Sequence, residues 1–146
     1  MKKITLFLIA LTCSFTAMAQ AMHGTYKVGT NGTEDFASLS AAVTALNTNG
    51  VDGNVILEIT SDITEAANFG LGINTNGYSI TIRPDADADR IITYTSTTDN
   101  TGPSGHFVIG NHTPTVTATD ANTIATNNVT VDGYANGFTT KRLKFT

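Results

Sequence analysis

Three aspartates that alternate along one short segment are the clearest candidates for chemistry. Asp85, Asp87 and Asp89 are separated by single alanines. Alternating carboxylates in an extracellular loop can bind Ca²⁺, because this hard cation prefers oxygen ligands. The EF-hand register is not met, since Arg90 occupies its glycine position and Ser96 its glutamate position. The sequence therefore leaves a metal site unknown, with these three acids as its candidates, and favours a solvated turn.

The histidines do not form a recognisable catalytic or metal-binding pattern. His106 and His112 stand six residues apart across a Gly-Asn pair, and His23 is remote from both in the sequence. That spacing matches no common zinc motif, and neither histidine has a serine or acid nearby in the arrangement of a triad. We therefore interpret them as loop residues and predict no catalytic and no cofactor-binding residue.

The N-terminus has the pattern of a cleavable secretory signal peptide over residues 1–19. Two lysines follow the first methionine, residues 4–11 are almost wholly apolar, and residues 17–19 read Ala-Met-Ala. The apolar run is shorter than the ~20 residues that a membrane span needs. The sequence predicts a secreted protein, extracellular or on the outer cell surface, that begins near Gln20 and does not insert in the membrane after cleavage.

Removal of this segment leaves an acidic chain without cysteine. Cys13 is the single cysteine and is lost with Lys2 and Lys3, so the mature chain of about 125 residues has six basic and twelve acidic residues. No disulfide, thiolate metal site or cysteine nucleophile is then available. A chain this acidic lacks the basic surface of a nucleic-acid binder, and its length fits a single domain.

One segment has the periodicity of a helix. Its apolar residues recur at spacings of three and four, which places them on one face; they are Phe36, Leu39, Ala42, Val43 and Leu46. Asp35 or Ser38 can cap its start, and Gly50 can end it in the left-handed conformation. We predict a helix over residues 35–50, after a leading segment over residues 20–34.

After Gly50 the pattern changes to short β-branched runs between turns. The runs are residues 55–59, 79–82, 91–94, 107–109, 129–131 and 143–145. Because no second helix separates them, they indicate a sandwich, a barrel or a solenoid. Their uneven spacing and the single leading helix favour the solenoid. We therefore predict an all-β solenoid over residues 51–146 with one N-terminal capping α-helix.

Several motifs resemble those of a known superfamily. Residues 25–29 (TYKVG) and 35–43 (DFASLSAAV) resemble the opening of right-handed parallel β-helix proteins of the pectate-lyase-like superfamily. Residues 80–84 (ITIRP), 128–133 (NVTVDG) and 141–145 (KRLKF) are similar to rungs of large surface proteins that Gram-negative bacteria export by type IX secretion. The resemblance covers nearly the whole mature chain and implies a right-handed parallel β-helix. Its motifs are structural, so it carries no functional residue over to this sequence.

The resemblance also predicts that these residues are part of a longer protein. Such proteins continue for many rungs and end in a sorting domain, whereas this sequence stops at Thr146, directly after the run 143–145. An unpaired end strand is prone to aggregation, and terminal repeats need a polar cap. We expect an N-terminal fragment. The alternative is a natural end whose exposed strand pairs with another molecule.

Two classes of function remain open. The first is a non-catalytic structural, adhesion or glycan-binding module, in which exposed side chains such as Tyr94 and Tyr134 contact an extracellular polysaccharide or a cell-surface glycan. The second is the N-terminal fragment of a secreted polysaccharide lyase or glycoside hydrolase whose active site is missing. The residues present favour the first class, because no paired acids with a nearby base are visible, and enzymatic activity stays uncertain.

Overall fold

The computed structural model describes residues 20–66, 69–95, 107–110 and 126–146, and the predicted signal peptide lies outside these ranges. The described residues form nine strands and one helix. In chain order they are β1 (Met22–Val28), α1 (Leu39–Asn49), β2 (Val51–Ile59), β3 (Ile63–Glu65), β4 (Phe69–Leu71), β5 (Ile80–Pro84), β6 (Arg90–Tyr94), β7 (Phe107–Ile109), β8 (Val129–Val131) and β9 (Leu143–Phe145).

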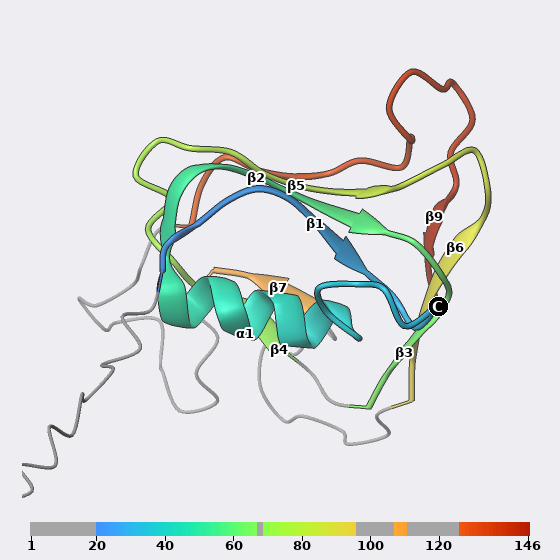
Figure 1. Cartoon of the computed structure of the whole chain (residues 1–146), viewed down its shortest axis with the longest axis horizontal. Helices are drawn as coiled ribbons and strands as arrows, with labels where there is room; N and C mark the ends of the chain where they lie inside the picture. Colours follow the sequence, from blue (N-terminus) through green and yellow to red (C-terminus); the bar gives the residue numbers. More distant parts are fainter. Residues whose placement is uncertain (1–19, 67–68, 96–106, 111–125) are drawn as a thin grey trace, which may run out of the picture.

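The strands form three small sheets in which neighbouring strands run parallel. The first has the order β1-β2-β5-β8, the second β3-β6-β9 and the third β4-β7. In Figure 1 the first sheet lies along one side of the molecule, and β3, β6 and β9 form a second side. Strand β4 packs against α1 and pairs with β7. The sheets therefore surround one shared interior.

The interior is filled by apolar side chains at matching register positions. In the first sheet Val55 lies opposite Ile80, and Leu57 lies opposite Ile82. All four side chains are fully buried. Because side chains alternate between the two faces of a strand, every second residue reaches this core. The alternation of buried and less buried residues along β2 and β5 follows from this arrangement.

Helix α1 begins at a serine cap and contributes one apolar face to the core. The hydroxyl of Ser38 accepts a hydrogen bond from the Ala41 N–H at 3.1 Å, which satisfies a backbone donor of the first turn. Residues Leu39, Ala42, Val43 and Leu46 are buried and form the face expected from their spacing. The helix packs against β1, β3 and β4. Gly50 ends it with a positive φ of 69°.

The prediction of an all-β solenoid with an N-terminal capping helix is wrong. The described residues form a mixed fold of short parallel strands in three small sheets with one helix, and neither a solenoid nor a capping helix is seen among them. The capping role required the helix to precede all the strands. Strand β1, however, precedes α1 in the chain and pairs with β2. The segment over residues 20–34, predicted as a lead-in, therefore contributes a strand of the largest sheet.

Candidate functional site

The three candidate metal ligands lie in the turn between β5 and β6, and each faces a cation. Asp85 is 2.8 Å from the guanidinium of Arg90. Asp87 is 2.6 Å from Arg142. Asp89 lies 3.3 Å from Arg142 and 2.6 Å from Lys144. Asp87 and Asp89 thus join the β5–β6 turn to β9 and to the residue before it, whereas Asp85 is paired with the first residue of β6.

The charges of this turn stabilise one another. Hydrogen bonds from Lys144 and then from Arg142 lower the pKa of Asp89. Hydrogen bonds to Asp87 and then to Asp89 raise the pKa of Arg142. Within the described ranges, no group of three or more His, Cys, Asp or Glu side chains is placed to hold a metal ion. The hypothesis that these aspartates bind Ca²⁺ stays a prediction.

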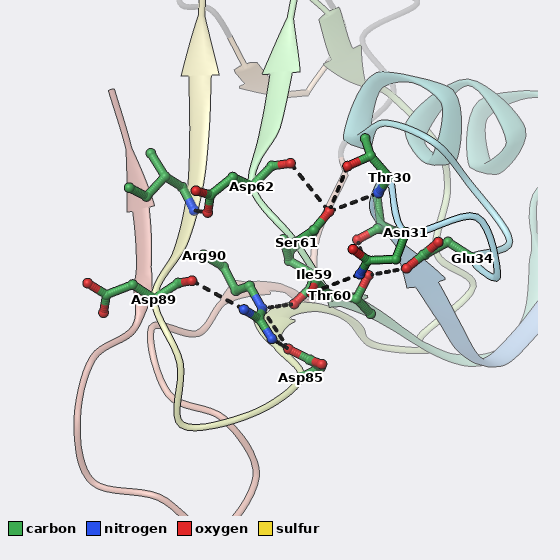
Figure 2. Close-up of polar contacts among 12 residues, drawn as sticks. Thr30, Asn31, Glu34, Ile59, Thr60, Ser61, Asp62, Asp85, Asp89 and Arg90 are labelled. Carbon is green, nitrogen blue, oxygen red and sulfur yellow. Dashed lines mark hydrogen bonds and ion pairs between the residues drawn. The ribbon is translucent and has the colours of Figure 1, made fainter.

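A second group of polar side chains gathers where β1 and β2 end. Figure 2 shows this corner, in which the Ser61 hydroxyl accepts a hydrogen bond from the Thr30 N–H at 2.8 Å. The amide of Asn31 donates to the Thr60 carbonyl at 3.4 Å. A Cβ on Gly29 would lie 2.3 Å from the Thr60 hydroxyl oxygen. Only glycine therefore fits between these two chain segments.

Glu34 completes this polar corner and is held in its charged form. The hydroxyl of Thr60 lies 2.9 Å from Glu34 Oε1 and 3.3 Å from the Val28 carbonyl, and its single proton serves the closer acceptor. The N–H of Thr33 donates to Oε2 at 2.9 Å. Desolvation raises the pKa of Glu34, but these hydrogen bonds and those from its own N–H and from Asn31 outweigh it and lower the pKa to about 2.

The same corner reaches the acidic turn through Arg90. Its guanidinium donates to the Ile59 carbonyl at 3.3 Å and to Asp85 at 2.8 Å. Asp62 accepts the N–H of Ile91 at 2.9 Å, which ties the start of β6 to the residue before β3 (Figure 2). These polar groups form hydrogen bonds to one another and to the backbone. They stabilise the chain where it turns from one sheet to the next.

A buried carboxylate that the sequence did not single out supports the start of α1. Glu65, only 2% exposed, accepts the N–H groups of Leu39 at 2.7 Å and Ser40 at 3.2 Å, and its second oxygen accepts the Ser40 hydroxyl at 2.6 Å. The positive end of the helix dipole favours a negative charge at this place. Burial and then the charge of Glu65 raise the pKa of Tyr94 to about 12.

The structure describes one of the three histidines. His23 Nδ1 lies 2.8 Å from Asp52 on the exposed surface of β1 and β2. His106 and His112 lie outside the described residues. The prediction that the histidines lie in loops is wrong for His23, which lies in β1 and is paired with an acid of the neighbouring strand.

The loop between β8 and β9 presents two aromatic rings to solvent. Tyr134 is 36% exposed and Phe138 is 48% exposed, whereas Ala135 between them is buried. The Phe138 N–H donates to the Ala135 carbonyl at 3.0 Å, and the amino group of Lys141 lies 5.9 Å from the centre of the Tyr134 ring. We call residues 134–141 the aromatic loop. The turn signal Asn136-Gly137 predicts the position of this loop. It does not predict that both rings are exposed.

The two tyrosines predicted as glycan contacts have different surroundings. Tyr134 is exposed, as expected. Tyr94 is only partly exposed and its ring stacks on Phe69, with a centroid distance of 6.1 Å. Tyr94 also lines a hollow of about 380 Å³. We call this the edge hollow, and its lining residues are Tyr94, Phe107, Val131, Phe145 and Thr146.

Comparisons with known proteins do not assign the chain to a family. No protein-family model matches it, and neither the curated proteins nor the solved structures gave a match. The resemblance to the pectate-lyase-like superfamily and to type IX-secreted proteins therefore stays a prediction. In the part of the chain that the structure describes, no helix is long and apolar enough to cross a membrane.

Proposed function

We propose that this chain is a secreted or surface-attached, non-catalytic adhesion module that binds an extracellular glycan through its aromatic loop. The observation that carries the proposal is the pair of exposed rings, Tyr134 and Phe138, on one hydrogen-bonded loop. An aromatic ring offers a flat apolar surface with a polar hydroxyl in the case of tyrosine. The C–H face of a sugar packs on such a ring while its hydroxyls bond to nearby polar groups.

The loop is held in a way that favours binding with little loss of entropy. Asp132 accepts the Tyr134 N–H at 2.9 Å, and the Arg142 N–H donates to the Gly133 carbonyl at 2.7 Å. The buried Ala135 anchors the loop to the body of the protein. A preorganised site pays less ordering entropy when a ligand binds. The ring of Tyr134 is therefore already positioned for a ligand, with the cationic Lys141 beside it.

The described ionisable groups support a non-catalytic role. The acids of the β5–β6 turn are paired with arginine and lysine. Glu58 is paired with Arg83 at 2.8 Å, and Glu65 is bound to the start of α1. A general acid or base needs a group free to exchange its proton with a substrate, and these carboxylates are engaged in holding the fold.

Export is the second part of the proposal and is supported by the leader pattern of residues 1–19. The abundance of Thr and Asn in the mature chain, together with its lack of cysteine, is compatible with a surface protein that depends on burial for its stability.

The proposal is tested by sedimenting the purified protein with insoluble polysaccharides of different charge and linkage. We expect retention on at least one of them, and we expect Tyr134→Ala and Phe138→Ala to weaken it. Tyr78→Ala is the matched control, because Tyr78 is 38% exposed but lies in a different turn. Equal binding by all variants would contradict the role of the aromatic loop. Release of new sugar ends from any polysaccharide would contradict the non-catalytic assignment.

A further inference from the structure

Lys141 gives the aromatic loop a positive charge that no acid of the described chain neutralises. Most of the other described cations are paired with carboxylates; these are Arg83, Arg90, Arg142 and Lys144. Lys27 makes no ion pair among the described residues either, but it lies opposite Glu58 in the register of the first sheet. The amino group of Lys141 is therefore available to an anionic ligand.

Two backbone contacts hold Lys141 beside Tyr134. The two residues form an antiparallel bridge between the ends of the loop. The aliphatic part of the lysine passes so close to Gly133 that a Cβ at this glycine would lie 3.3 Å from Lys141 Cγ. The amino group lies 5.9 Å from the centre of the Tyr134 ring, a distance at which a cation and an aromatic ring attract each other. The ring and the charge thus form one unit.

The loop that carries this unit projects outward from the sheets. In Figure 1 the red segment between β8 and β9 extends beyond the neighbouring turn between β5 and β6. Lys141 is exposed, as are the rings of Tyr134 and Phe138. A ligand that approaches from solvent can therefore contact an aromatic ring and the amino group at the same time.

A ring beside an unpaired lysine suits a sugar that carries a negative charge. The apolar face of the sugar packs on the ring, and a carboxylate or sulfate group of the same sugar accepts a charge-assisted hydrogen bond from the amino group. A neutral sugar gains the ring contact alone. Since the mature chain has six basic and twelve acidic residues, its net charge repels acidic polysaccharides. Attraction to them would depend on the local charge of Lys141.

We propose that the aromatic loop selects acidic sugars, with the carboxylate or sulfate group bound by Lys141 and the sugar ring packed on Tyr134. This inference rests on the proposed glycan-binding function and adds to it the chemical class of the ligand.

The test repeats the sedimentation measurement with cellulose, chitin and mannan, each in three forms. The forms share one backbone and are unmodified, oxidised at C6 to a uronate, or sulfated at C6. We expect several-fold stronger retention on the charged forms of at least one polysaccharide, and a loss of this difference at high salt. Comparison of the uronate and sulfate forms identifies which anionic group is preferred.

Three variants examine the role of the lysine. Lys141→Ala should reduce retention on the charged forms to that on the unmodified form, whereas Lys141→Arg should keep the preference. Lys27→Ala is the matched control, because Lys27 is the other described lysine without an ion pair and lies on β1, away from the aromatic loop. It should keep the preference for the charged forms.

The possible failures are distinguishable. Equal retention on charged and unmodified forms that is still weakened by Tyr134→Ala would overturn the selection of acidic sugars and leave the proposed function standing. A preference for the charged forms that survives in Lys141→Ala would overturn the role of Lys141. The absence of retention on every form would overturn both the proposed function and this inference.

Discussion

At the scale of single residues, carboxylates of this protein hold together segments that are far apart in the sequence. Glu34 binds Thr60, and Glu65 binds the first turn of α1. Asp89 binds Lys144, 55 residues away. Glu34 and Glu65 look like ordinary surface or strand residues in the sequence, and Asp89 was considered there only as a candidate metal ligand. Their roles depend on which backbone groups and cations the fold brings close to them.

Glu34 should titrate near pH 2 in the folded protein. Its lowered pKa means that the charged form stabilises the fold above the ordinary value of 4.5, and that this contribution is lost as the pH falls toward 2. Thr60→Val removes the hydroxyl donor, so it should raise the pKa of Glu34 toward 4.5. Carboxyl NMR titration of both proteins measures the change, and an unshifted Glu34 in the wild type would contradict it.

Glu65 should be the most sensitive carboxylate for stability. Glu65→Ala leaves two helix N–H groups and one hydroxyl without their buried acceptor, which should cost about 3 kcal/mol. Glu65→Gln retains one acceptor oxygen and should cost less. Thermal unfolding followed by circular dichroism measures both. Glu58→Gln is the control, because Glu58 and its partner Arg83 are only partly buried, with side chains 20% and 18% exposed. A larger loss there than in Glu65→Ala would refute this ranking.

The candidate site was predicted only in part, and the reason is distance along the chain. The turn position of Asp85, Asp87 and Asp89 follows from the strand that ends at Pro84. Their partner Arg142 comes from a segment that no local pattern connects to this turn.

At the scale of helices and strands, local pattern predicted much of the secondary structure but not its assembly. Six predicted runs correspond to β2 and β5 to β9, and the apolar stripe predicted the helix that forms as α1. Strands β1, β3 and β4 were not predicted. β1 exposes most of its residues, β3 has three residues that include the buried Glu65, and β4 has three with a central glycine. The all-β solenoid was wrong because the described strands form three small parallel sheets and the helix packs against β1, β3 and β4.

The loss in free energy of unfolding when an apolar residue is truncated should depend on which strand of the sheet carries it. Ile82→Ala creates a cavity at a fully buried position and should cost about 2–5 kcal/mol. Val131 lies opposite Ile82 on the neighbouring strand β8. Val131→Ala removes a side chain that is 42% exposed and should cost about 1 kcal/mol or less. Urea unfolding of the two variants gives the comparison. Equal losses would mean that β8 is covered in solution.

At the scale of the whole molecule, export is the prediction with the most direct measurement. N-terminal sequencing of the protein recovered from the medium or the cell surface should begin at Gln20, because residues 17–19 fit a signal-peptidase site. Ala19→Arg should block cleavage and leave the longer chain attached to the membrane, whereas Gln20→Ser should not. Recovery of the uncleaved chain in the cytoplasm would refute export.

The strand order of the first sheet also has a consequence for biosynthesis. Strands β1, β2, β5 and β8 lie side by side in the order in which they leave the ribosome, and β3, β6 and β9 do the same. None of the described strands has to be inserted between two that are already paired. Although pairings distant in sequence slow folding, each of these strands emerges from the ribosome after the strand with which it pairs. The described sheets can therefore assemble during synthesis, before the rest of the chain has left the ribosome.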